Sequence, residues 1–504
     1  MFSMRKWHRW LGLGLGWLML VWFISGAVMI YVRLPRQYKR PAGRLGGSLI
    51  LDPAKVKLDF ARAWERAGRP RPLAGARLAL VAGRPAFIFR LDRGGYRLVW
   101  ADSGEVVSRV SPRLARRAAR GVIPGEAPLH YQGLVRQDQW TVGASVADAY
   151  RPLYKFRAED GAGSEIYVSA RTGEVCQLTT AGDRFWSWLG AIPHWLYFTV
   201  LRRHLVVWEW VIIVLSALGC LLCLTGLWLG IRYFSLSAWG RARFRRHSAF
   251  LGIRKWHHYL GLVFGLPTLA LVFSGLMSMA PLHWCTPASP SPAQVRALSG
   301  GPLRPELCRL HPARALEALG SCFRAGMLRL VSFQGRPYLL ARDGKGNTRL
   351  LPAWQNRPRV LAALSREELV AAARNLLPGW SLARADLLPR GDIYLPGWER
   401  PVLRVRYADP RQTWLYLDPA CLQIVRRLDR TGRLNRWLYR FLHTLDLPWL
   451  LEHEPLRQAI LLFLLAGGSL LCVTGPWSWL ARRKRRRVRK QRALLSGRGA
   501  GRTP

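Results

Sequence analysis

Hydrophobic positions along the chain are concentrated in four long runs, near residues 10–32, 206–231, 257–281 and 458–480. A helix needs about 20 residues to cross the roughly 30 Å apolar core of a bilayer. Each run is long enough, so the pattern predicts four transmembrane helices. The first run is too long for a signal peptide and SGAVMIYV is followed by no convincing cleavage site, so we expect it to remain as an anchor.

The two segments between the runs, 33–205 and 282–457, have a different pattern. LDPAKVKLDFARAWERAG and LSREELVAAARNLLPG place apolar residues on one helical face, and Ser365 and Glu368 have the spacing of a capping box. GGYRLVWADSGEVV, SEIYVSARTGEV and QTWLYLDPACLQIV alternate apolar and polar residues before a polar turn, as hairpins do. The segments therefore predict two small α+β domains, each with a core of its own.

Basic residues outnumber acidic ones by 77 to 29, and they favour one orientation in the membrane. The tail ARRKRRRVRKQR and the short loop between the second and third runs are strongly basic. Short basic loops stay in the cytoplasm, whereas long domains cross regardless of their charge. Both termini are therefore predicted to be cytoplasmic, with both α+β domains in the periplasm or outside the cell. The tail is expected to contact membrane lipid, and the scattered arginines follow no nucleic-acid-binding pattern.

Eight cysteines are present, and their spacing matches no zinc site. Cys308 and Cys322 lie in an outer segment, where an oxidising compartment permits a disulfide if their Cα atoms come within about 6 Å. Cys220 and Cys223 lie within an apolar run, so we interpret them as packing residues rather than a redox motif.

The chain contains an internal duplication with an offset of 249 residues. The matching stretches are RKWH at 5–8 and 254–257, Ser25-Gly26 and Ser274-Gly275, RPLYKFR at 151–157 and RPVLRVR at 400–406, Trp188 and Trp437, and LCLTGLW at 222–228 and LCVTGPW at 471–477. Each copy consists of a span, an outer domain and a second span. Asp392, Ile393 and Tyr394 have no counterpart at this offset, so gaps that cancel are expected within the outer domains.

Several stretches resemble the PepSY-associated transmembrane (PepSY_TM) family over nearly the whole chain. They are IYVSARTGEV, TWLYLDPACLQIV, RWLYRFLHTLDLPWL, and the span openings WHRWLGL and WHHYLGL with FSGLMSM. The resemblance implies a bacterial inner-membrane protein with periplasmic PepSY domains, and some members are similar to ferric-siderophore reductases that hold two b haems in a four-helix bundle. Cys421-Leu422 replaces Thr172-Gly173 in the second copy, which puts the geometry of that turn in question.

The predicted fold class is a membrane α-helical protein with four transmembrane helices, an internal duplication and two periplasmic α+β PepSY-like domains. The predicted division is transmembrane helix 1 at 1–32, PepSY-like domain 1 at 33–182, an interfacial helix with transmembrane helix 2 at 183–233, a cytoplasmic basic loop at 234–255, transmembrane helix 3 at 256–281, PepSY-like domain 2 at 282–434, an interfacial segment with transmembrane helix 4 at 435–480, and a cytoplasmic basic tail at 481–504.

Three pairs of histidines obey the repeat. They are His8 with His257, His194 with His443, and His204 with His453. In a pseudo-twofold bundle, equivalent histidines approach the same axis and can supply both axial ligands of one haem iron. The first pair lies at the cytoplasmic mouths of spans one and three, and the second at the outer approaches of spans two and four. The third pair lies ten residues further on, at a different helical face, and remains the alternative outer pair.

Other interpretations of these residues stay open. His8 and His257 can instead anchor their helices at the membrane interface, and His258 is a weaker candidate because its counterpart is Arg9. The unpaired histidines are expected to be solvated; they are His130, His247, His283 and His311. The glycines of the spans permit close helix approach or leave room for a porphyrin; they are Gly12, Gly16 and Gly26 and their copies Gly261, Gly265 and Gly275.

The first functional hypothesis is a di-haem electron-transfer protein that reduces periplasmic ferric chelates such as siderophores. As an enzyme it would be a haem-dependent ferric(-siderophore) reductase. No G-x-G-x-x-G motif follows a predicted strand, so its electrons come from a quinol or a cytoplasmic donor rather than from a nicotinamide or flavin of its own. The alternative is a non-enzymatic PepSY-domain membrane protein that binds or regulates a periplasmic partner, with the histidines stabilising the bundle. Transport is disfavoured because charged residues are scarce in the spans.

Overall fold

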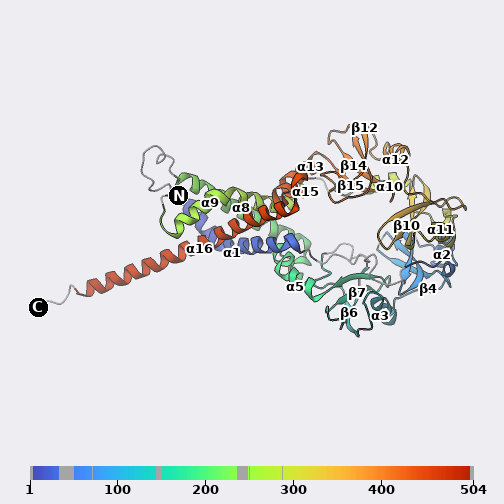
Figure 1. The fold of residues 1–504 in the computed structure, drawn as a ribbon, viewed down its shortest axis with the longest axis horizontal. Coiled ribbons are helices and arrows are strands. Elements are labelled where there is room, and N and C mark those ends of the chain that lie inside the picture. Colours follow the sequence, from blue (N-terminus) through green and yellow to red (C-terminus); the bar gives the residue numbers. More distant parts are fainter. Residues whose placement is uncertain are drawn as a thin grey trace. The chain divides into compact units, whose positions relative to one another are not determined.

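The protein is described from a computed structural model, which covers residues 4–32, 34, 50–70, 72–92, 94–143, 150–234, 248, 250–285 and 288–499. The chain divides into two compact units (Figure 1). The helical unit comprises Met1–Leu34, Phe185–Trp284 and Leu434–Pro504. The sheet unit comprises Pro35–Arg184 and Cys285–Arg433.

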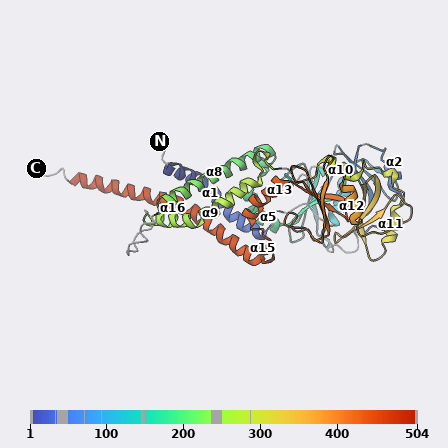
Figure 2. The same ribbon diagram turned by 90° about the horizontal axis from the view of Figure 1, so that it is seen from above.

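Four long helices form the core of the helical unit, and they lie side by side in both views (Figures 1 and 2). They are α1 (Met4–Tyr31), α8 (Leu205–Arg232), α9 (Ile253–Ser278) and α16 (Glu454–Gly499). All four are long and apolar enough to cross a membrane, α16 over Glu454–Lys484, which confirms the four predicted spans. Because α1 and α9 each pack against both α8 and α16, α1 and α9 lie diagonally across the bundle.

Shorter helices precede α8 and α16. In the first copy they are α5 (Ala181–Leu189), α6 (Ala191–His194) and α7 (Thr199–Arg202). In the second copy they are α13 (Arg430–Asn435), the π-helical turn η5 (Arg436–Phe441), α14 (Leu442–Thr444) and α15 (Pro448–Glu452). A 3₁₀ turn, η3 (Pro281–His283), follows α9. The segment α6 packs against α1, and η5 and α14 pack against α9, so the two copies dock their short helices in the same way.

The sheet unit contains three antiparallel sheets. The first copy contributes η1 (Pro53–Lys55), α2 (Phe60–Arg66), β1 (Leu73–Val81), β2 (Arg84–Leu91), β3 (Tyr96–Trp100), β4 (Val106–Val107), α3 (Pro112–Arg120), β5 (Leu129–Val135), β6 (Leu153–Ala158), β7 (Glu165–Ser169) and β8 (Val175–Thr179). The second copy contributes α10 (Pro292–Ser299), η4 (Pro305–Leu307), α11 (Pro312–Leu319), β9 (Ala325–Phe333), β10 (Arg336–Asp343), β11 (Thr348–Pro352), α12 (Arg366–Ala373), β12 (Leu382–Leu388), β13 (Val402–Tyr407), β14 (Trp414–Asp418) and β15 (Gln423–Leu428). The strand orders are β11-β10-β9-β1-β2-β3-β4, β5-β6-β7-β8 and β12-β13-β14-β15.

The seven-stranded sheet joins the two copies. Strand β1 pairs antiparallel with β9, with Leu78 opposite Leu328. One buried cluster covers this sheet and includes Phe60 and Phe87 from the first copy and Leu339 from the second. The prediction of a separate core for each outer segment is therefore wrong for this sheet, because its central strands come from different copies. Each four-stranded sheet packs against a helix of its own copy, α3 or α12.

The cancelling gaps predicted from the repeat are present in the sheet unit. The offset is 252 between the starts of β1 and β9, 253 between those of β5 and β12, and again 249 between those of β6 and β13. Asp392 accordingly has a counterpart at a shifted offset, Asp138. The hydroxyl of Tyr167 donates to Asp138 at 2.6 Å, and that of Tyr416 donates to Asp392 at 2.9 Å.

Local expectations for the sheet unit are mostly confirmed. Helix α12 has the capping box of Ser365 and Glu368. The altered turn of the second copy keeps the left-handed conformation, since φ is +54° at Leu422 and +68° at Gly173. Leu422 is nevertheless buried, and its packing offsets the cost of about 1–2 kcal/mol for a side chain at positive φ. Cys308 is buried and Cys322 exposed, and both are free thiols, so no disulfide joins them.

Candidate functional site

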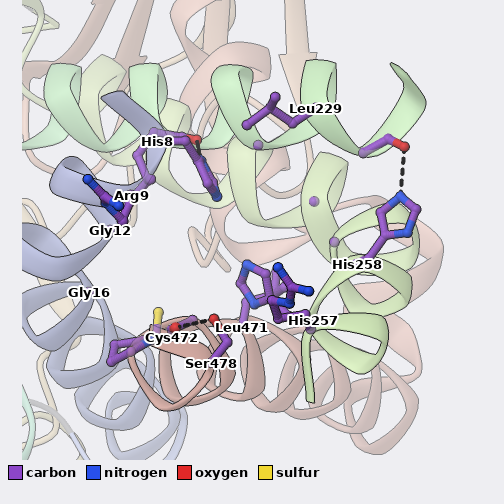
Figure 3. Close-up of a pocket in the computed structure, with 18 of the residues that line it drawn as sticks. His8, Arg9, Gly12, Gly16, Leu229, His257, His258, Leu471, Cys472 and Ser478 are labelled. Atoms are coloured by element: carbon purple, nitrogen blue, oxygen red, sulfur yellow. Dashed lines mark hydrogen bonds between the residues drawn. The ribbon is translucent and has the colours of Figure 1, made fainter. Parts of the chain in front are cut away.

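The first histidine pair lies across the diagonal of the helical bundle. His8 is in the second turn of α1 and His257 in the second turn of α9. Their ring centres are 6.3 Å apart and their planes are inclined by 46°. Figure 3 shows the two rings approaching the same cavity from opposite sides. The structure therefore brings together the residues that the sequence pairs.

The hydrogen bonds of His8 define which ring nitrogen carries its proton. Nδ1 lies 3.2 Å from the carbonyl oxygen of Leu222 and 3.3 Å from Oγ1 of Thr225. The Thr225 hydroxyl donates its only proton to the Leu222 carbonyl at 2.9 Å. Both neighbours are therefore acceptors, so Nδ1 carries the hydrogen and donates it. This tautomer leaves the lone pair of Nε2 directed away from α8 and available to a ligand.

His257 repeats this arrangement against α16. Its Nδ1 lies 2.9 Å from Oγ1 of Thr474, whose hydroxyl donates to the carbonyl of Leu470 at 2.7 Å. Thr474 is 249 residues after Thr225. The same tautomer is thus imposed on both rings by equivalent threonines. Metal-binding histidines commonly have their second nitrogen oriented by such a partner.

The second pair, His194 and His443, also meets in the helical unit. The ring centres are 6.0 Å apart and the planes are inclined by 61°. Nδ1 of His194 lies 3.0 Å from the carbonyl oxygen of Trp22 and 3.3 Å from Oγ of Ser25. The Ser25 hydroxyl donates to the carbonyl of Val21 at 2.6 Å, so Nδ1 of His194 is again the donor.

His443 has the equivalent contacts on α9. Its Nδ1 lies 3.0 Å from Oγ of Ser274 and 3.3 Å from the carbonyl oxygen of Leu271. Burial and the neighbouring His443 lower the pKa of His194 to about 4, and burial lowers the pKa of His443 as well. Both rings are therefore neutral near pH 7, which is the form that binds metals.

Each of the four imidazoles lies against a glycine. The contacts are His8 with Gly226, His257 with Gly475, His194 with Gly26, and His443 with Gly275. A Cβ at Gly226 would lie 2.8 Å from Cε1 of His8, closer than real side chains approach. Sequence reasoning identified Gly26 and Gly275 but missed Gly226 and Gly475, although both occur in the repeated LCLTGLW and LCVTGPW stretches.

A cavity of about 300 Å³ surrounds the His8 and His257 pair. Its wall includes four of the glycines predicted to make room in the bundle, namely Gly12, Gly16, Gly261 and Gly265. Figure 3 shows Gly12 and Gly16 on one side of the cavity and Leu471 and Cys472 on the helix below. The lack of side chains at these positions leaves the space between the helices open.

The two pairs lie at different depths of the bundle. On α1, His8 and Ser25, the partner of His194, are 17 positions apart, which is about 25 Å at the helical rise of 1.5 Å per residue. The space between the pairs is filled by a buried apolar cluster. Its fully buried members are Met19, Phe23, Leu222, Leu271 and Val272.

The alternative outer pair does not come together. His204 is exposed and immediately precedes α8 as its N-cap residue. His453 is also exposed, and its Nδ1 lies 2.8 Å from the carbonyl oxygen of Trp449 in its own helical turn. His258 uses both ring nitrogens, at 2.7 Å from Ser248 and 2.8 Å from the Gly230 carbonyl. Neither the exposed pair nor His258 offers the arrangement of the two central pairs.

The described unpaired histidines belong to other elements than those that carry the two central pairs. His130 contacts Glu159 at 2.9 Å on the surface of the sheet unit, and His311 begins α11. His283 belongs to the turn η3. His247 and most of the basic loop around it lie outside the described residues.

The model of the PepSY-associated TM region matches the chain over residues 5–482. The chain belongs to this family. The protein is thus a multi-pass membrane protein with four candidate spans and extramembrane α+β domains. No curated protein matches the sequence.

Each pair offers two Nε2 nitrogens to a bound group, and this small number restricts which metals the protein can hold there. Across the described residues, no group of three or more histidine, cysteine or acidic side chains is placed to hold a metal ion. A structural zinc ion needs about four protein ligands. A metal held by either pair would therefore need further ligands besides the two imidazoles.

Proposed function

We propose that this protein holds two b haems, one between His8 and His257 and one between His194 and His443. The observation that carries the proposal is the fourfold repetition of one arrangement. Each ring donates from Nδ1, leaves Nε2 free and faces the equivalent ring of the other copy. A haem supplies four nitrogens to its iron, so two imidazoles complete the coordination.

The separation of the rings fits a shared metal. A coordinated imidazole nitrogen lies about 2 Å from the metal and about 1 Å in front of its ring centre, so two opposed imidazoles have centres about 6 Å apart. The observed separations are 6.3 Å and 6.0 Å. Simple packing of two rings against each other would not require both this separation and two Nε2 atoms without hydrogen bonds. The open cavity beside the first pair also supports the proposal.

We infer that the two sites form an electron path across the bacterial inner membrane. With both termini in the cytoplasm, the His8 and His257 pair lies at the cytoplasmic end and the sheet unit is periplasmic. The distance of about 25 Å between the levels of the pairs approaches the roughly 30 Å thickness of the apolar core. Bound haem would supply a one-electron iron couple at each end. The protein's residues hold each ring in one tautomer and exclude water between the sites.

The electron acceptor is proposed to be a periplasmic ferric chelate such as a siderophore complex. The sheet unit offers a basic surface suited to anionic chelates, because α3 carries four arginines around an open hollow. They are Arg113, Arg116, Arg117 and Arg120. The equivalent helix α12 instead has Glu367 and Glu368 in its first turn. The donor is proposed to be a quinol or a cytoplasmic reductant.

Absorption spectroscopy of the full-length protein in detergent tests the proposal. We expect a Soret band and, after reduction with dithionite, the split visible bands of low-spin haem. Addition of a ferric siderophore complex should then restore the oxidised spectrum. A protein without a Soret band contradicts the proposal and favours the non-enzymatic alternative, in which the outer domains bind or regulate a partner. Reduced haem that the chelate leaves unchanged rejects the reductase activity alone.

A further inference from the structure

The cavity beside His8 and His257 has a strongly basic lining. Four arginines line it: Arg5, Arg9, Arg254 and Arg482. Figure 3 shows Arg9 beside His8 and Gly12. Within the described part of the chain, no aspartate or glutamate contributes to the same lining. Four cations around one cavity repel one another, so the arrangement favours an anionic ligand.

Aromatic and hydroxyl groups, rather than carboxylates, hold three of these arginines. Arg5 donates to the hydroxyl of Tyr233 and packs over its ring at 4.4 Å. The guanidinium of Arg254 lies 5.4 Å from the ring centre of Phe250, and that of Arg9 lies 5.1 Å from the ring centre of Trp10. Such contacts orient a guanidinium without neutralising it.

Arg9 supplies a more direct sign of a ligand. Its Nε is buried and has no hydrogen-bond partner among the described residues. A buried donor without an acceptor is destabilising, so such a donor is usually hydrogen-bonded to the protein, to water or to a bound ligand. An arginine that served only to set membrane orientation would extend into water, where its nitrogens are solvated.

Apart from the histidines, Thr268 and Ser478, most of the remaining lining is apolar or lacks side chains. Leu13, Leu227 and Met19 line the cavity together with the glycines described above. The complete ligand is therefore amphiphilic, with a flat apolar body beside the glycines and acidic groups beside the arginines. Haem has this character, because its porphyrin carries two carboxylates on one edge.

We propose that Arg5, Arg9, Arg254 and Arg482 bind the two carboxylates of the haem held by His8 and His257. This inference rests on the proposed function and adds the orientation of the haem within the cavity. The carboxylate edge faces the end of the bundle where α1 and α9 begin, and the apolar edge faces Met19, Cys223 and Cys472. Guanidinium and carboxylate groups form charge-assisted pairs that are stronger than neutral hydrogen bonds.

A binding titration of the full-length His443→Ala protein tests the inference, since only the His8 and His257 pair remains complete. The haem-depleted protein is titrated with ferric protohaem and with its dimethyl ester, which lacks both negative charges. We expect protohaem to bind at least about tenfold more tightly than the ester. The double change Arg5→Gln and Arg254→Gln should weaken protohaem about tenfold and leave the ester unchanged.

Two further arms control the titration. Arg232→Gln is the matched control, because Arg232 ends α8 and packs over Trp228 at 5.3 Å without lining the cavity. It should leave both affinities unchanged. Binding of the ester by the double variant also shows that this variant is folded.

Three results overturn the inference. Equal affinities for protohaem and its ester contradict it while leaving the haem proposal intact. If protohaem and its ester bind with equal affinity and their binding releases an anionic phospholipid from the arginines, the arginines are assigned to lipid headgroups instead. Failure of both porphyrins to bind rejects the proposed haem between His8 and His257.

Discussion

The two histidine pairs share their immediate contacts and differ in what surrounds them. In both, Nδ1 is fixed by a hydroxyl and each ring rests on a glycine. The rings of the first pair come from long helices and border a cavity whose lining, within the described residues, includes four arginines and no aspartate or glutamate. The rings of the second pair come from the short α6 and α14, on segments docked against α1 and α9.

Two arginines near the second pair share one carboxylate. Arg436 and Arg440 lie 3.1 and 3.0 Å from the carboxylate of Asp446, which follows α14. Asp446 has a nearly buried side chain, at 3% exposure. Duplication has thus preserved the geometry of the histidine pairs, while local charge has diverged. Charge and solvent exposure tune the potential of a haem, so the two proposed haems are expected to differ in potential.

Removing one ligand from either pair is expected to have the largest effect. His8→Ala and His443→Ala should each lower haem content by about half, because one of two sites loses an axial ligand. His204→Ala and His453→Ala are matched controls from the exposed pair and should leave haem content unchanged. Pyridine-haemochrome assays of purified protein provide the measurement. Loss of haem in the controls alone would assign the outer site to His204 and His453.

Loss of the buried ion pair is expected to have the second-largest effect and to affect only the second site. Asp446→Asn removes the negative charge beside Arg436 and Arg440, and loss of a buried charged partner costs about 3–5 kcal/mol. We expect release of the second haem during purification and retention of the first. Asp52→Asn is the control, because its pair with Lys55 at 3.8 Å is exposed and such pairs contribute at most about 1 kcal/mol. Equal loss of both haems would show that Asp446 supports the bundle as a whole.

The glycines beside the rings provide a sharper comparison. Gly226→Ala places a Cβ 2.8 Å from His8, whereas Gly275→Ala places one 3.9 Å from His443. The first change should displace the ring at a cost of about 1–3 kcal/mol and weaken haem binding at that site. The second is ordinary contact and should be tolerated. Haem titration with each variant measures the difference, and equal affinities would contradict the closer approach of His8 to its glycine.

Loss of an orienting hydroxyl should have the smallest effect. Thr225→Val removes one acceptor of His8 but retains the Leu222 carbonyl. We expect a loss of haem affinity of up to about tenfold, at the weak end of the range for such partners. Ser274→Ala removes the shorter contact of His443, with the Leu271 carbonyl remaining at 3.3 Å, and should have a similar or larger effect. A gain of affinity in either variant would contradict the assigned role of the hydroxyls.

The spans and the paired histidines were predictable because each depends on local pattern or on the repeat offset. Which outer histidines meet was not predictable, because the sequence does not show whether one helix continues from His194 to His204. In the structure the chain breaks there, with Leu196 in the left-handed conformation and a new helix beginning after His204. The pairing of β1 with β9 was also beyond prediction, since hydrophobic alternation defines a strand but not its partner.

Haem stoichiometry tests the central claim most directly. The wild-type protein is predicted to contain two haems per chain, and the double variant His8→Ala and His443→Ala is predicted to contain none while remaining folded by circular dichroism. A wild-type protein without haem, or a double variant that retains haem at the wild-type level, would contradict the account.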